Sequence, residues 1–124
     1  MTAKVSTFLM FSGQAEAAMN FYVSLFPDAR VINRAEGSVK PASFTLNDQN
    51  FMCFDSPVKH DFTFTPATSI FVTCDSEAEV DRLFKALSEG GQILMPLDAY
   101  PFSKRFGWTA DRFGVSWQIN LSAA

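Results

Sequence analysis

Apolar residues in the first half of the chain recur at spacings that indicate four short strands and one helix. A run of β-branched and aromatic residues over 5–11 predicts the first strand. Ser12 can cap the helix that follows, and Pro27, which has no backbone N–H, is expected to end it. The helix carries one apolar stripe at i, i+3, i+4, i+7 and i+8: Ala18, Phe21, Tyr22, Leu25 and Phe26. Three further strands are expected over 30–36, 42–46 and 51–54, with a turn at 47–50.

The same order of elements recurs in the second half. An apolar strand is expected over 68–74, and Ser76 with Glu79 forms a capping box for a second helix, which Gly90-Gly91 would end. Its apolar stripe comprises Val80, Leu83, Phe84 and Leu87, each 62 residues after its counterpart in the first helix. The remaining strands are expected over 92–95, 105–109 and 115–121, with a turn at 111–114.

The repeated order predicts an α+β fold built from two β-α-β-β-β modules within a single domain, 1–124. The modules are expected at about 4–56 and about 67–122, joined by the connection 56–67. At about 60 residues, each half is marginal as an independent domain. We therefore expect the two halves to share a core.

Composition and charge narrow the function classes. Hydrophobic residues make up 48% of the chain and charged residues 19%, which excludes a disordered protein. The net charge of −3 and the absence of a basic stripe argue against nucleic-acid binding. No apolar run is long enough to cross a membrane, and the N-terminal residues do not resemble a signal peptide. Cys53 and Cys74 lack the CxxC spacing, so we expect two buried thiols in a cytoplasmic protein.

Several segments resemble the PhnB-like proteins, and together they cover nearly the whole chain. They are FLMFSGQAEAAMNFY at 8–22, SLFP at 24–27, FTFTPA at 62–67 and, most specifically, GWTADRFGVSWQ at 107–118. This family often carries the label 3-demethylubiquinone-9 3-methyltransferase. It belongs to the vicinal oxygen chelate superfamily, with glyoxalase I, extradiol dioxygenases and bleomycin-resistance proteins. The resemblance implies paired β-α-β-β-β modules, a curled mixed sheet around a cleft, and a homodimer.

The methyltransferase label finds no support in the residues. Binding of S-adenosylmethionine commonly uses a glycine-rich turn after the first strand of a doubly wound sheet. The chain has six glycines, and the only adjacent pair, Gly90-Gly91, follows a helix, where glycine is an ordinary stop. We do not expect this activity.

The superfamily's metal positions, carried over by resemblance, fall on weak ligands. They are Thr7, either Met52 or Cys53, Ser69 and Gln118. Catalytic zinc generally takes three ligands from His, Cys and carboxylates. The single histidine, His60, lies in the connection between the modules. We therefore expect no metal and no cofactor.

The residues that remain describe a polar, uncharged cleft. On the last strand, Trp117, Ile119 and Leu121 should face the helix and Ser116, Gln118 and Asn120 the cleft, although a solvated face explains the two amides equally well. The cleft-lining candidates are Thr7, Cys53, Ser69, Trp108, Gln118 and Asn120.

Weaker candidates lie outside this set. Phe102 could join Trp108 in an aromatic wall, and Lys104-Arg105 could hold an anion at the mouth of the cleft. His60-Asp61 could serve acid–base work, although neighbours on an extended segment point apart.

The sequence leads to one main functional hypothesis and two alternatives. The main one is binding of a small, partly apolar organic molecule in a metal-free cleft, with the reaction, if there is one, unknown. The alternatives are a metal-dependent lyase or isomerase of the glyoxalase type, and a drug-sequestering resistance protein. The neutral cleft positions speak modestly against a site for cationic drugs.

Overall fold

Both halves of the chain fold into the same order of elements, β-α-β-β-β. The structure is a computed structural model and describes residues 2–37 and 40–123. The chain divides into two units, residues 1–61 and 62–124, and each is described by itself. Each unit holds one helix and one four-stranded sheet with both parallel and antiparallel neighbours. The predicted α+β fold with its repeated order is confirmed, and the strands form two separate sheets, neither of them closed.

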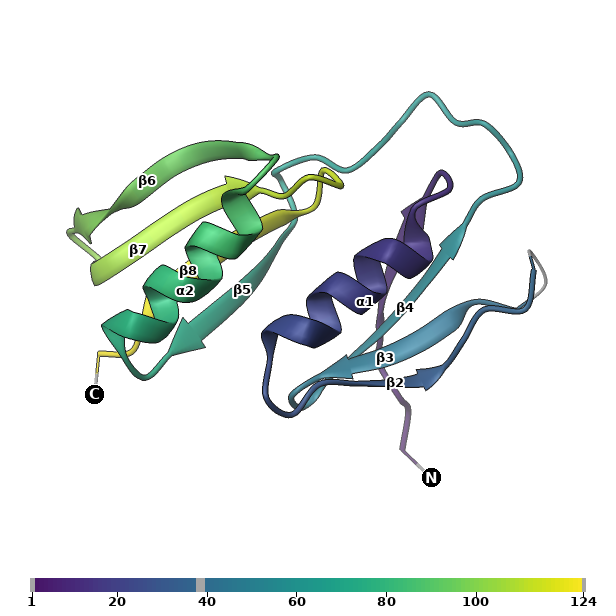
Figure 1. Ribbon diagram of the computed structural model, residues 1–124, viewed down its shortest axis with the longest axis horizontal. Helices are drawn as coiled ribbons and strands as arrows, with labels where there is room; N and C mark the ends of the chain where they lie inside the picture. Colours follow the sequence, from purple (N-terminus) through teal and green to yellow (C-terminus); the bar gives the residue numbers. More distant parts are fainter. Residues whose placement is uncertain (1, 38–39, 124) are drawn as a thin grey trace. The chain divides into compact units, whose positions relative to one another are not determined.

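The first unit packs helix α1 on one face of its sheet (Figure 1). Its elements are β1 (Thr7–Phe11), α1 (Ala15–Leu25), β2 (Arg30–Asn33), β3 (Ala42–Leu46) and β4 (Gln49–Asp55). The strand order is β1-β4-β3-β2, with β1 parallel to β4 and the other pairs antiparallel. Between helix and sheet lie the fully buried Ala18, Met19 and Tyr22 of the helix and Phe44 and Cys53 of the strands.

The second unit repeats this arrangement with longer strands. Its elements are β5 (Ser69–Cys74), α2 (Glu77–Ser88), β6 (Gln92–Tyr100), β7 (Ser103–Ala110) and β8 (Ser116–Leu121). The order is β5-β8-β7-β6, again with one parallel pair, β5 and β8. The predicted stripe of α2 is confirmed, since all four of its residues are buried: Val80, Leu83, Phe84 and Leu87.

The helices begin in different ways. Ser76 caps α2 as predicted, because its side chain accepts a hydrogen bond from the Glu79 amide at 3.2 Å. The predicted cap Ser12 is wrong: α1 begins at Ala15 without a local side-chain cap. Instead, Oδ1 of Asp55, at the end of β4, accepts from the amides of Gly13 at 2.7 Å and Ala15 at 2.9 Å. A carboxylate distant in sequence thus satisfies the start of α1.

The stripe of α1 is shifted from the prediction. Ala18, Tyr22 and Leu25 are buried, but Phe21 and Phe26 are only half-buried. Ala15 and Met19 complete the buried stripe instead, because they continue the face that Ala18 and Tyr22 start.

Several strand boundaries also differ. The turn predicted at 47–50 is shorter, because Asn47 takes a left-handed φ of 54° and β4 already begins at Gln49. Strand β6 runs to Tyr100, five residues beyond its predicted end, and it passes through Pro96. Proline fits there because β6 is an edge strand of the sheet, where a missing N–H costs no ladder bond. In the described part of the chain, no helix is long and apolar enough to cross a membrane.

Candidate functional site

Strands β5, β7 and β8 turn alternate side chains toward α2 and away from it. Arg105, Gly107 and Thr109 of β7 face the helix: Arg105 pairs with Asp81, a Cβ on Gly107 would collide with the ring of Phe84, and Thr109 accepts from Ser88 at 3.0 Å. The residues between them, and their neighbours across the ladder, therefore point away from α2. We call this second side the helix-free face. It comprises Ser69, Phe71 and Thr73 of β5, Phe106 and Trp108 of β7, and Ser116, Gln118 and Asn120 of β8.

Four predicted site residues come together on the helix-free face. Ser69 lies opposite Ser116 in the β5–β8 ladder, and Trp108 lies opposite Gln118 in the β7–β8 ladder. Asn120 follows two residues later on the same side of β8. The predicted alternation of β8 holds as well, because Trp117 and Ile119 are completely buried on the α2 side.

A chain of hydrogen bonds connects three of the side chains on this face. The indole Nε1 of Trp108 donates to Ser116 Oγ at 2.8 Å. Ser116 Oγ lies 2.6 Å from Ser69 Oγ. Ser116 is 2% exposed, whereas Ser69 and Trp108 are half-buried, so the chain runs from one accessible group to another through a buried one.

The two amides on β8 have free hydrogen-bonding capacity. Gln118 and Asn120 are half-buried, and neither side chain has a hydrogen-bond partner among residues 2–37 and 40–123. Each primary amide offers two donors and one acceptor oxygen. They stand next to Trp108 and Phe106 respectively, so polar groups and aromatic surface alternate along the face.

Aromatic rings extend the face beyond Asn120. Phe106 is buried at the centre of a cluster with Phe71, Tyr100 and Phe102, at ring-centroid distances of 6.3, 5.9 and 4.9 Å. Phe71 is 56% and Phe102 65% exposed, so the outer rings offer apolar surface to solvent.

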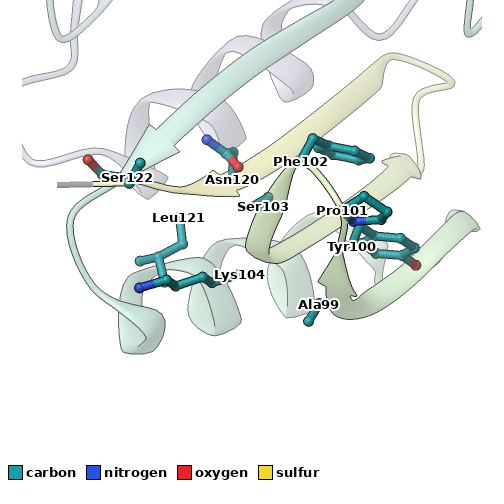
Figure 2. Close-up of a pocket in the computed structure, with 10 residues that line it drawn as sticks. Ala99, Tyr100, Pro101, Phe102, Ser103, Lys104, Asn120, Leu121 and Ser122 are labelled. Carbon is teal, nitrogen blue, oxygen red and sulfur yellow. The ribbon is translucent and has the colours of Figure 1, made fainter.

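A hollow of about 380 Å³ adjoins the cluster. It is formed by the β6–β7 hairpin, Ala99–Lys104, and by the end of β8 with the segment after it, 120–123 (Figure 2). Figure 2 shows Lys104 beside Leu121, and Asn120 on the other side of the strand. Asn120 lines the hollow and also belongs to the helix-free face, so it links the two.

The two candidates from the first unit, Thr7 and Cys53, lie on the side of their sheet that faces α1. Cys53 is fully buried, and its thiol lies 3.8 Å from the Ala15 carbonyl oxygen of α1. Thr7 alternates with the buried Leu9 and pairs with the buried Phe51, which places it on the α1 side. For both residues the predicted orientation, away from the helix, is wrong. Met52, which the sequence left open as the alternative to Cys53, alternates with the buried Phe51 and Cys53 and faces away from α1.

The two buried cysteine thiols are unreactive near neutral pH. Burial, assisted by the negative charge of Asp55, raises the pKa of Cys53 to about 11. Burial also raises the pKa of Cys74 to about 11, together with Glu79 and Asp75 and against the opposing effect of Arg82. Because the thiolate is the nucleophile and the metal ligand, both residues act as small apolar core residues near neutral pH.

The weaker candidates Lys104, Arg105 and Phe102 do not form one site. Lys104 lines the hollow, but its neighbour Arg105 is engaged by Asp81 of α2, which raises the pKa of the guanidinium. The two cations therefore do not form one anion site. Phe102 belongs to the ring cluster around Phe106.

The connection between the units holds a Ser–His contact that the sequence did not reveal. His60 Nε2 lies 3.0 Å from Ser56 Oγ on an exposed loop. Ser56 Oγ also donates to the Val58 carbonyl at 2.9 Å and accepts from the Val58 amide at 3.1 Å. The Ser56 hydroxyl is thus also engaged by the local turn at Val58, so the contact does not mark an activated nucleophile.

Ser116 is the site residue that sequence reasoning passed over. Alternation predicts that Ser116 lies on the cleft-facing side of β8, but a serine in a strand has no signal that marks it as a site residue. Its partners come from β5, 47 residues earlier in the sequence, and from β7, eight residues earlier, and the sheet brings both to it.

Comparison with protein families gives a match along nearly the whole chain. The family model described as 3-demethylubiquinone-9 3-methyltransferase matches residues 3–120. The chain belongs to this PhnB-like family.

Solved structures agree with that membership. A PhnB protein from Bacillus cereus, described with the same methyltransferase name, is 53% identical, with 97% of this chain and all of that chain covered and a TM-score of 0.90. A protein from Pseudomonas aeruginosa is 27% identical, with 98% of each chain covered and a TM-score of 0.80. A lactoylglutathione lyase from Agrobacterium tumefaciens shares the fold at 18% identity, with 98% and 95% coverage and a TM-score of 0.64. The PhnB-like chain thus has the fold of the vicinal oxygen chelate superfamily.

The comparisons assign no reaction to this PhnB-like chain. No curated protein matches it. The methyltransferase name is a family label, and the glycines of the chain bear this out: Gly90 takes a φ of 75° at the end of α2, as expected for a helix stop, and Gly91 packs against Ala110 of β7.

The residues at the superfamily's metal positions do not fit a metal. Of the four, Cys53 and Thr7 point toward α1, and Ser69 is engaged by Ser116. Gln118 remains as a single neutral oxygen donor, whereas a catalytic zinc site takes three protein ligands. Among the described residues, no three His, Cys, Asp or Glu side chains gather closely enough to hold a metal ion.

Proposed function

We propose that this PhnB-like protein binds a small, partly apolar organic molecule on the helix-free face of its second unit, without a metal or a cofactor. The observation that carries the proposal is the pair of amides, Gln118 and Asn120, which lie half-buried and without hydrogen-bond partners in the described chain. They stand between aromatic surface on either side, Trp108 and the ring cluster around Phe106.

The chemistry of this face favours an uncharged ligand. Strands β5 and β8, which form its centre, contain no charged residue. The face instead offers amide and hydroxyl groups beside exposed rings, the mixture that small-molecule sites use for orientation and for apolar contact. Covering apolar surface contributes roughly 25 cal/mol per Å², so a ligand lying over Phe71 would gain binding energy from that ring.

The two tryptophans provide a test that is specific for the site. Trp108 lies on the helix-free face, whereas Trp117 is completely buried and donates to Asp111. A panel of metabolites is first screened for compounds that raise the melting temperature, because a ligand that binds only the native state stabilises it. In N–H correlation spectra, a compound that binds as proposed shifts the indole signal of Trp108 and leaves that of Trp117 in place.

A matched pair of variants separates the site from general effects. Gln118→Ala should weaken binding by about two- to twelvefold through loss of one hydrogen bond. Gln49→Ala makes the same change on an exposed position of β4 and should leave the affinity unchanged. Stabilising compounds that shift neither Trp108 nor its neighbours would contradict the proposal.

Catalysis and sequestration differ in what happens to the ligand. A sequestering protein returns the compound unchanged, whereas an enzyme converts it and loses turnover in Gln118→Ala. Mass spectrometry of the ligand after incubation distinguishes these outcomes. Elemental analysis of protein purified without chelators tests the metal-free assignment, which one equivalent of a transition metal would overturn.

We also propose that the protein forms a homodimer in the cytoplasm. The first sheet ends in the edge strands β1 and β2 and the second in β5 and β6, and edge strands invite pairing with another chain. Both cysteines are free and buried, which suits a reducing compartment. Native mass spectrometry at micromolar concentration should show a dimer, and a monomer alone would contradict this.

A further inference from the structure

We infer that the Ser69 hydroxyl donates a hydrogen bond to the ligand, so that the ligand is a planar, apolar molecule carrying a neutral oxygen acceptor such as a ketone carbonyl. The inference rests on the proposed function, because it names the chemical class that the helix-free face selects. It follows from the direction of the hydrogen bonds that join Trp108, Ser116 and Ser69.

The direction of the chain is set at Trp108. An indole N–H can only donate, so Ser116 Oγ must accept at their 2.8 Å contact. This bond occupies one lone pair of Ser116 and leaves its hydroxyl proton to be placed.

Burial of Ser116 decides where that proton goes. The residue is 2% exposed, and a buried hydroxyl that lacks an acceptor is costly. Ser69 Oγ, at 2.6 Å, is the only acceptor that the described residues offer to it. Ser116 therefore donates to Ser69.

Ser69 then keeps its own proton for another partner. Its oxygen already accepts from Ser116, and in the described chain its hydroxyl proton has no acceptor. Ser69 is half-buried and lies on the helix-free face, so the proton is available there. Donation along a chain of hydrogen bonds also polarises the last member and strengthens it as a donor.

The surroundings of Ser69 limit the kind of acceptor group that its hydroxyl can bind. Phe71 follows it on the same side of β5 and is 56% exposed, which provides an apolar platform for a planar molecule. Because β5 and β8 carry no cation, an anionic oxygen placed here would lose water without gaining a countercharge. A neutral carbonyl oxygen satisfies the donor without that cost.

Two naphthalene probes of matched shape test the inference. 2-Acetylnaphthalene carries a carbonyl acceptor, and 2-ethylnaphthalene replaces it with a methylene group. Each is titrated into nitrogen-15 labelled protein while the Trp108 indole signal is followed. We expect both to shift that signal and the ketone to bind about two- to twelvefold more tightly, which corresponds to one net hydrogen bond.

Variants locate the preference at Ser69. In Ser69→Ala the ketone should fall to the affinity of the hydrocarbon, and the hydrocarbon should be unaffected. Thr68→Ala removes an exposed hydroxyl from the residue before β5, outside the helix-free face, and should preserve the ketone preference. In Ser116→Ala the preference should shrink, and the Trp108 indole proton should move upfield because it loses its acceptor. An unchanged Trp117 signal verifies that each variant is folded.

The outcomes separate this inference from the proposed function. If neither probe shifts Trp108, the face does not bind planar apolar molecules and the proposed function fails with the inference. If both probes shift Trp108 with equal affinity, or if Ser69→Ala retains the ketone preference, the face binds but Ser69 is not the donor. Only loss of the preference in Ser69→Ala, with Thr68→Ala unchanged, supports the inference.

Discussion

Replacing Asp111 by asparagine should destabilise the second unit, because this buried carboxylate holds three donors in place. Oδ1 accepts from the amides of Phe113 at 2.8 Å and Val115 at 3.1 Å, and Oδ2 accepts from the indole of Trp117 at 2.9 Å. Asp111 is 3% exposed and Trp117 is completely buried. These bonds fix the turn between β7 and β8 and thereby the register of the two strands that carry the candidate site.

The size of the effect follows from the donor count. Asparagine has the same shape but one acceptor oxygen and one donor group. If its oxygen faces the two amides, its NH₂ meets the indole N–H; if it is flipped, the NH₂ meets the amides. Each orientation leaves at least one donor facing another donor. A hydrogen bond to a charged group is worth about 1.5–3 kcal/mol and an unsatisfied buried donor costs about 1–3 kcal/mol, so we expect a loss of about 2–4 kcal/mol.

Urea unfolding followed by far-ultraviolet circular dichroism measures this loss. With a slope of about 1–3 kcal/mol per molar urea for small proteins, the midpoint should fall by about 1–3 M. Asp75→Asn makes the same chemical change at an exposed position before α2 and should change stability by less than about 0.5 kcal/mol.

A double-mutant cycle with Trp117→Phe tests the mechanism. Phenylalanine has no N–H, so in that background Asp111→Asn no longer faces the indole donor. Its cost should fall to about 1 kcal/mol. An Asp111→Asn variant as stable as the wild type, or equal costs in both backgrounds, would show that Asp111 does not hold these donors as described.

Three further perturbations probe the fold and the buried thiols. Asp55→Ala removes the cap of α1 and should cost about 1 kcal/mol in the urea midpoint analysis. Gly107→Ala should cost about 1–3 kcal/mol in the same assay, because the added Cβ overlaps the buried ring of Phe84. Folding holds the thiol pKa of Cys53 and Cys74 at about 11, against an ordinary value of 9.0. Their contribution to stability is therefore complete below pH 9 and is lost as the pH rises from 9 to 11, so urea midpoints should fall over that range.

Each of these predictions has a matched control. Asp48→Ala removes an exposed carboxylate from the turn before β4 and should leave the midpoint unchanged, in contrast to Asp55→Ala. Gly107→Ala combined with Phe84→Leu should cost less than the sum of the single changes, because leucine lacks the ring that the Cβ meets. Replacing both cysteines by alanine should reduce the decline of the midpoint above pH 9, and an identical decline would sink the assignment to the thiols.

The sequence predicts the order of helices and strands because each element is recognised from the short-range periodicity of its apolar residues. The α2 stripe and its cap Ser76 depend on residues within a few turns of each other, and they agree with the structure. The cap of α1 was missed because Asp55 reaches Gly13 across 42 positions of the chain, which no local pattern encodes. The end of β6 was missed because proline usually ends a central strand, and the position of β6 at an edge is a property of the sheet.

The site residues of the second unit were predictable from the sequence, and those of the first unit were not. Strand alternation placed Gln118 and Asn120 correctly, because the apolar Trp117 and Ile119, which alternate with them along β8, are core residues. In β4, a run of apolar residues hides the alternation, so Met52 and Cys53 could not be told apart by pattern. Ser116 could not be identified as a site residue from the sequence, because its hydrogen bonds to Ser69 and Trp108 form only in the folded sheet.

We have proposed that a small organic molecule binds on the helix-free face of the second unit. A crystal structure of the protein soaked with the most stabilising compound from the metabolite screen tests it most directly. We expect density over Phe71 and Trp108, with a polar atom of the compound within hydrogen-bond distance of Gln118, Asn120 or Ser69. A well-ordered compound bound elsewhere, with Gln118 and Asn120 facing only water, would contradict it.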